Sequence, residues 1–140
     1  MILVSSCLLG LSCRYDGKAK ADESVLEYLK DKVYIPVCPE QMGGLTTPRD
    51  PAEIISRSPL SIETADGKDV TDAFVKGVTE VDKLLDLHKV ELAILKSKSP
   101  SCGRYEIYDG TFTRTPIKET GIFAENLISK NIKVINENDV

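Results

Sequence analysis

The sequence has no tryptophan and a single histidine, His88, so a metal site in this chain has to depend on ligands other than imidazole. Its 18 basic residues are outnumbered by 22 acidic ones, and the net charge of −4 offers no broad positive surface for long nucleic acid. The apolar opening MILVSSCLLGL has no basic segment before it and is too short and too interrupted to cross a bilayer. We therefore expect a cytoplasmic protein that binds neither membranes nor long nucleic acid.

The 140 residues are expected to form one domain over residues 1–140, because two independent cores need a longer chain. Short apolar, β-branched runs predict four buried strands, at 2–6, 33–37, 91–96 and 133–135. Segments with helical spacing of apolar residues lie between them, at 22–30, 71–87 and 121–130. This alternation predicts an α/β fold with a mostly parallel sheet and flanking helices.

Two polar excursions interrupt this order. Residues 61–70 contain Asp66-Gly67 and residues 105–114 contain Asp109-Gly110. Both dipeptides are typical of tight turns between short antiparallel strands, so we expect a small β-hairpin at each place.

Three of the four cysteines follow predicted strands. Cys7 and Cys38 come directly after the first two strands, and Cys102 lies six residues beyond the third. Because the carboxyl ends of parallel strands meet at one edge of a sheet, these thiols are expected to lie close together. Cys13 is one short loop beyond Cys7 and could join them. The alternative is that free cysteines simply pack as small apolar residues.

The spacing of the cysteines favours an iron–sulfur cluster over zinc. Zinc knuckles separate two cysteines by two to four residues, whereas the closest pair in this chain, Cys7 and Cys13, is separated by five. Iron–sulfur clusters accept thiolates from scattered positions, and Pro39 stiffens the turn after Cys38. A [4Fe-4S] cluster held by only three thiolates would keep one iron open for substrate, so zinc remains the second interpretation.

Two polar residues beside the cysteines are candidates for catalysis. Glu40, two residues after Cys38, could act as a general base with a pKa moved by burial, or it could be an exposed loop charge. Ser101, directly before Cys102, could donate a hydrogen bond to substrate or sulfide. The commoner role of serines in a segment such as SPSCG is to build the turn.

The segments SSCLLGLSCRYDGK, VCPEQMGGLTTPRDPAEI and ILKSKSPSCGRYEIYDGTFT resemble the thiouracil-desulfidase-like family long labelled domain of unknown function 523. The resemblance covers nearly the whole chain. It implies a [4Fe-4S] cluster held by Cys7, Cys38 and Cys102, with Glu40 and Ser101 at catalytic positions. Cys13 matches the second N-terminal cysteine of the family pattern.

The leading hypothesis is thus an iron–sulfur enzyme that removes sulfur from thiolated uracil or a related small thiocarbonyl compound without net redox change. The expected partner is a small thiolated pyrimidine, and the expected product is hydrosulfide. Two alternatives stay open: another sulfur-transfer reaction at the same cluster, and a zinc- or cluster-binding module without desulfidase activity.

Overall fold

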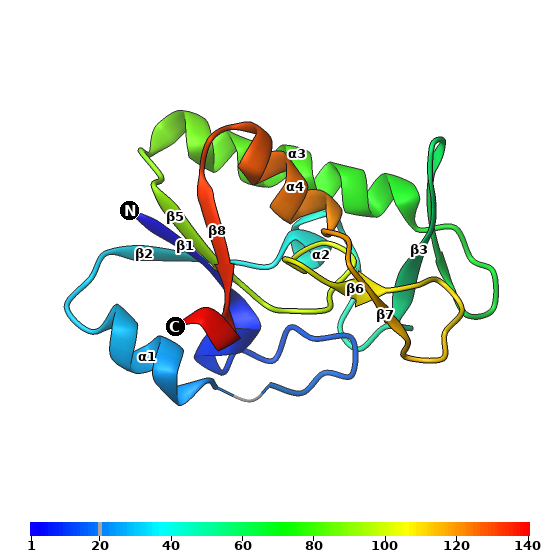
Figure 1. Cartoon of the computed structure of the whole chain (residues 1–140), viewed down its shortest axis with the longest axis horizontal. Helices are drawn as coiled ribbons and strands as arrows, with labels where there is room; N and C mark the ends of the chain where they lie inside the picture. The colour runs from blue at the N-terminus through cyan, green and yellow to red at the C-terminus, as the bar shows by residue number, and fades with distance from the viewer. Residues whose placement is uncertain (20) are drawn as a thin grey trace.

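A four-stranded parallel sheet lies at the centre of the computed structural model, which describes residues 1–19 and 21–140 (Figure 1). The strands stand side by side in the order β2-β1-β5-β8, and all three pairings are parallel. Their bounds are β1 Ile2–Ser5, β2 Tyr34–Val37, β5 Leu92–Leu95 and β8 Lys133–Asn136. The four predicted strands and their parallel arrangement are confirmed.

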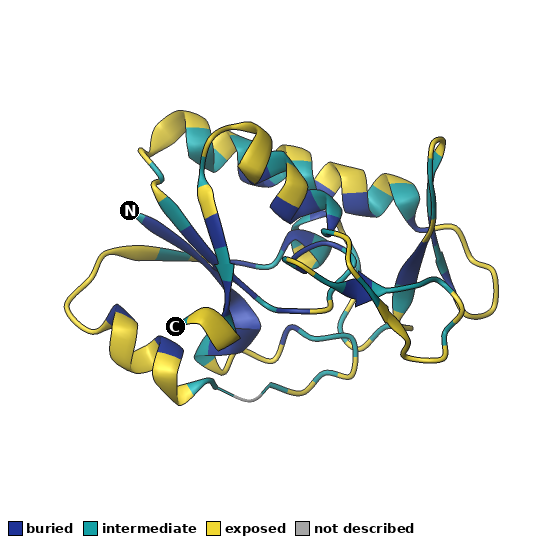
Figure 2. Cartoon of the chain, viewed as in Figure 1, coloured by how far each residue is buried: buried dark blue, intermediate teal, exposed yellow. Residues whose placement is uncertain are grey.

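Helices cover both faces of this sheet, which explains why its strands are apolar without alternation. The three longer helices are α1 Glu23–Leu29, α3 Thr71–Leu87 and α4 Ile122–Ser129. Leu3 and Ala93 pack in the core that includes residues of α3 and α4, whereas Val4 and Ile94 pack in the core that includes residues of α1. Figure 2 shows the buried residues along the sheet and on the sides of the helices that face it.

The α/β fold expected from the sequence is therefore confirmed. The side chain of Asp22 caps α1 by accepting a hydrogen bond of 3.0 Å from the backbone N–H of Val25.

In the part of the chain that the structure describes, no helix is long and apolar enough to pass through a bilayer.

Three short helices were not predicted from the sequence: the 3-10 helices η1 Ser6–Leu9 and η2 Glu137–Asp139, and α2 Pro39–Met42. Each is three or four residues long, which is too short for apolar periodicity to reveal it. Two of them matter for the candidate site, because η1 follows β1 directly and α2 begins immediately after Cys38. Pro39 occupies the first position of α2, where its fixed φ suits a helix start.

The two excursions contain antiparallel hairpins; the turn predicted at Asp66-Gly67 is present, whereas the tight turn predicted at Asp109-Gly110 is not. The first hairpin pairs β3 Ala52–Arg57 with β4 Leu60–Thr64, so it turns at Ser58-Pro59. Asp66-Gly67 forms a turn after β4 that is closed by one bridge, from Glu63 to Asp69. The pairing of β3 with β4, which the sequence did not predict, buries Ile54 and Ile62 in one apolar cluster.

The second hairpin pairs β6 Ile107–Tyr108 with β7 Pro116–Ile117. Asp109-Gly110 opens a longer loop here instead of making a two-residue turn. The backbone N–H of Asp109 donates to the carbonyl of Thr115, and that of Gly110 donates to the buried carboxylate of Glu53 at 2.9 Å. The expected tight turn is therefore wrong, because a tertiary contact with the first hairpin determines the course of this loop.

A close contact between two backbones places α2 against α3. A Cβ atom added at Gly77 of α3 would lie 1.9 Å from the carbonyl oxygen of Pro39, and one added at Gly43 would lie 1.9 Å from that of Ala73. The two segments can approach this closely only because both positions are glycine. The contact fixes the start of α2, and with it Cys38 and Glu40.

Replacing Gly77 with alanine is expected to destabilise the protein by about 2 kcal/mol, as overpacking of a tight contact usually does. The direction of this change in stability is informative, because alanine in a helix is ordinarily favoured over glycine by about 1 kcal/mol. Urea denaturation of the two proteins measures the difference. Val75→Ala, at a position of the same helix that is 44% exposed, is the matched control and should change little. A Gly77→Ala protein as stable as the wild type would contradict the contact.

Candidate functional site

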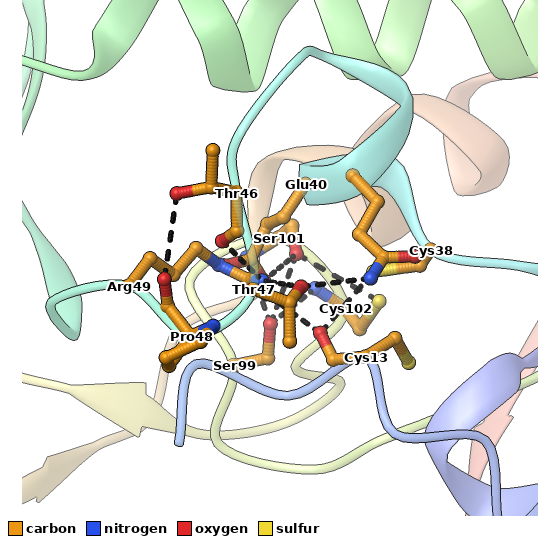
Figure 3. A network of polar contacts seen from close by, with 11 residues as sticks. Cys13, Cys38, Glu40, Thr46, Thr47, Pro48, Arg49, Ser99, Ser101 and Cys102 are labelled. Atoms are coloured by element: carbon orange, nitrogen blue, oxygen red, sulfur yellow. Dashed lines mark hydrogen bonds and ion pairs between the residues drawn. The ribbon is translucent and has the colours of Figure 1, made fainter. Parts of the chain in front are cut away.

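The four cysteines gather at the carboxyl edge of the parallel sheet. Cys7 lies in η1 after β1, Cys38 follows β2, Cys102 lies in the loop after β5, and Cys13 lies in the loop after η1. None of them forms a disulfide bond, and all but the half-buried Cys38 are buried. Figure 3 shows Cys13, Cys38 and Cys102 close together. The structure thus brings together the thiols that the sequence placed at separate strand ends.

Cys13 lies between two other cysteines. The thiols of Cys38 and Cys7 both lie close enough to that of Cys13 to shift its pKa, and Sγ of Cys38 donates to the backbone carbonyl of Cys13 at 3.8 Å. The contact with Cys38 lowers the pKa of Cys13, but the contact with Cys7 and burial outweigh it and raise this pKa to about 11. The contact with Cys13, together with burial, raises the pKa of Cys38 above its usual value.

Cys102 is buried, and burial raises its pKa to about 12. Buried thiols with raised pKa values are neutral at physiological pH unless a cation compensates the thiolate charge. A bound metal provides that charge and deprotonates a thiol outright. In the absence of such a cation these thiols are poorly suited to act as free nucleophiles.

Glu40 and Ser101 contact one another beside these thiols. The hydroxyl of Ser101 donates to Oε2 of Glu40 at 3.0 Å and lies 3.8 Å from Sγ of Cys102. The side chain of Glu40 is only 18% exposed and that of Ser101 is buried, so Glu40 is not the exposed loop charge that the sequence left open. The turn-building role falls to Ser99, whose hydroxyl oxygen accepts from the backbone N–H groups of Ser101 and Cys102.

Arg49 joins this network and was missed by the sequence analysis. Its side chain is only 9% exposed, and one terminal nitrogen, Nη2, donates to Oε1 of Glu40 at 3.3 Å and to the carbonyl oxygen of Cys13 at 3.0 Å (Figure 3). The only available signal was its position in TTPRD, shortly after the segment with Cys38 and Glu40. A loop arginine is usually exposed, so the sequence gave no reason to direct it inward.

An ionic contact anchors the start of the loop that carries Ser101 and Cys102. The carboxylate of Glu137 accepts from Nζ of Lys96 at 2.7 Å and from the backbone N–H of Ser97 at 2.9 Å. Burial opposes ionisation of Glu137, but the contacts with Lys96 and Ser97 outweigh burial and hold its pKa below the usual value. The last strand and the 3-10 helix after it therefore hold this loop at the edge of the sheet.

The described donor groups do not form a site for a single metal ion, and their chemistry is compatible with an iron–sulfur cluster. Among the described residues, no three His, Cys, Asp or Glu side chains are placed to hold one ion. A cluster spreads its ligands over several irons, so its thiolates need not converge on one point. His88 does not contribute, because it is exposed between α3 and β5, at the opposite edge of the sheet.

The fold and the site together define an α/β protein with a sulfur-lined site and, beside it, a partly buried carboxylate bonded to a buried hydroxyl. The chain matches the family model described as 2-thiouracil desulfurase over residues 2–139, and it belongs to that family. This confirms the resemblance seen in the sequence.

Two relatives extend over almost the whole chain. The uncharacterized protein YbbK of Bacillus subtilis (strain 168) is 40% identical over 147 residues, which span 100% of this chain and 97% of the relative. A solved structure of the [4Fe-4S]-dependent thiouracil desulfidase TudS (DUF523Vcz) is similar with a TM-score of 0.91 and 36% identity, over 99% of this chain and 91% of that chain.

Proposed function

We propose that this chain is a [4Fe-4S]-dependent desulfidase that removes sulfur from thiolated uracil or a related small thiocarbonyl compound and releases hydrosulfide. Family membership and the likeness to TudS support the proposal. The observation that carries it furthest is the direct contact of Ser101 with both Glu40 and Cys102, because this places acid–base groups beside a candidate cluster ligand. We propose a cytoplasmic location, where reducing conditions keep thiols available for the cluster.

In this proposal Cys7, Cys38 and Cys102 hold the cluster as thiolates. Once bound, the cluster supplies a soft Lewis acid that attracts the sulfur of a thiocarbonyl group and polarises its carbon–sulfur bond. Cys13 contacts Cys7 and Cys38, so it is either a further ligand or a neighbour that packs against two ligands. Zinc is the alternative metal for the same thiols.

The reaction is a hydrolysis: water and the thiocarbonyl compound give the carbonyl compound and hydrogen sulfide, with no net electron transfer. The carboxylate of Glu40 takes a proton from the attacking water, whose oxygen then forms the new carbon–oxygen bond. Ser101 holds one carboxylate oxygen by its hydrogen bond of 3.0 Å and can turn its hydroxyl toward charge that develops on the substrate. When the carbon–sulfur bond breaks, the sulfur leaves as hydrosulfide with the proton that Glu40 returns, and the second proton of the water is released as the new carbonyl group forms.

Anaerobic reconstitution followed by a sulfide-release assay tests the proposal. The protein is loaded with iron and sulfide, and its iron content and its absorbance at about 400 nm are measured. It is then offered 2-thiouracil, 4-thiouracil and their nucleosides. We expect equal amounts of released sulfide and oxygenated product from the iron-loaded protein. Metal-free and zinc-loaded samples are the controls and should be inactive.

The same assay separates the alternatives. A loaded cluster that releases sulfide from none of these compounds would contradict the desulfidase and leave a different sulfur-transfer reaction or a binding module. A protein that takes up stoichiometric zinc but no iron would favour the zinc-binding module.

A further inference from the structure

We propose that Arg49 is a positioning residue that orients the carboxylate of Glu40 for proton transfer. This inference rests on the proposed function, since it concerns the group that we assign as the general base. It is carried by the contacts of Arg49 within the described residues.

One terminal nitrogen of Arg49 binds residues of its own loop, and the other binds residues of two other segments. Nη1 donates to the carbonyl oxygen of Thr46 at 3.2 Å and to the hydroxyl of Thr47 at 3.0 Å. Nη2 donates to Cys13 and to Glu40. Four of the five N–H donors of a guanidinium group are thus committed, and because the group is planar, these bonds fix its orientation as well as its place.

The carboxylate of Glu40 is held from two sides by different segments. Ser101 binds Oε2 at 3.0 Å, and Arg49 binds Oε1 at 3.3 Å. A glutamate has three rotatable side-chain bonds, so a single hydrogen bond leaves its carboxylate free to turn about that contact. Two contacts on different oxygens define the plane of the group, which is the requirement for a base that must meet a water molecule in one direction.

Packing alone does not hold Glu40 in this orientation. A cavity of about 70 Å³ borders both Glu40 and Arg49, and its wall includes Thr64 and Phe74. Side-chain packing therefore leaves space on this side of the carboxylate. The bond to Arg49 restrains Oε1 beside that space, and the bond from Arg49 to the carbonyl of Cys13 links this restraint to the segment that carries Cys13.

The test uses reconstituted Arg49→Ala and Arg49→Lys proteins, each also combined with Glu40→Gln. Misplacement of a reacting group by about 1 Å can cost about 100-fold in rate, so we expect Arg49→Ala to lower kcat by about 100-fold. KM, iron content and cluster absorbance should stay close to those of the wild type. Arg49→Lys keeps the charge without the planar fork, so it should recover about tenfold of that loss. In proteins that already carry Glu40→Gln, replacement of Arg49 should lower kcat little further, because the base that it orients is already absent.

Arg57→Ala is the matched control. Like Arg49, Arg57 forms ion pairs with glutamate, in its case with Glu119 and Glu125. It is 32% exposed and lies in the hairpin of β3 and β4, so its replacement should leave kcat unchanged. A wild-type kcat in Arg49→Ala, or equal fold losses in the presence and absence of Glu40, would overturn the role of Arg49. If Arg49→Ala loses its cluster or its fold, Arg49→Lys decides: wild-type kcat overturns the role, and a lowered kcat with full iron content supports it. An inactive wild type would instead refute the proposed function, and this inference with it.

Discussion

Replacement of Cys38 by serine is expected to remove the cluster and abolish sulfide release. Cys38 is the half-buried member of the group, it lies directly before α2 as its N-cap, and its thiol contacts Cys13. A serine hydroxyl is a hard, weakly acidic donor and a poor substitute for thiolate at iron. Removing a residue that is hydrogen-bonded to a metal ligand already lowers metal affinity by about 10- to 100-fold. Removing a ligand itself should therefore lower the bound iron by at least about tenfold. Iron analysis and absorbance after anaerobic reconstitution measure this.

The four cysteines provide their own comparison. Cys7→Ser and Cys102→Ser should behave like Cys38→Ser if all three are ligands, while Cys13→Ser shows whether the fourth thiol binds metal or only packs against Cys7 and Cys38. Thermal melting of the metal-free proteins checks that each replacement leaves the fold intact. A Cys38→Ser protein that loads iron and releases sulfide like the wild type would remove this residue from the proposed ligand set.

Glu40→Gln is expected to lower kcat by about 1,000-fold while the cluster remains bound. The amide has nearly the same size and can still accept the hydrogen bond from Ser101, but it cannot take a proton from water, and general base catalysis contributes about 100- to 10,000-fold. Single-turnover sulfide release by the reconstituted protein isolates this step from substrate binding and product release.

Glu53→Gln is the matched control for Glu40→Gln. Glu53 is a buried carboxylate that accepts hydrogen bonds from the backbone N–H groups of Gly110 and Phe112 in the second hairpin. Its replacement should lower thermal stability and change kcat by no more than about twofold, because it touches no group that we assign to the reaction. If Glu40→Gln retained iron and kept the kcat of Glu53→Gln, another group would have to be the base.

The secondary structure was predictable wherever apolar residues formed a sustained pattern. The strands at Ile2–Ser5 and Leu92–Leu95 and the helix Thr71–Leu87 follow from their apolar runs and spacing. The tight turn expected at Asp109-Gly110 was wrong because Asp-Gly is a local signal, and the contact of Gly110 with Glu53 determines the course of that loop. The short α2 depends on the close contact between Gly43 and α3, which no local pattern reveals.

The sequence by itself determined the α/β class and the meeting of Cys7, Cys38 and Cys102 at one edge, because parallel strands bring their carboxyl ends together whatever the loops do. It also placed Glu40 and Ser101 next to those cysteines, since each is only one or two residues away along the chain. Only the tertiary structure decided that Cys13 contacts two other thiols and that Arg49 turns inward to Glu40. These contacts depend on the paths of irregular loops, which are set by packing and hydrogen bonds between segments distant in the chain, and neither is encoded in a local pattern.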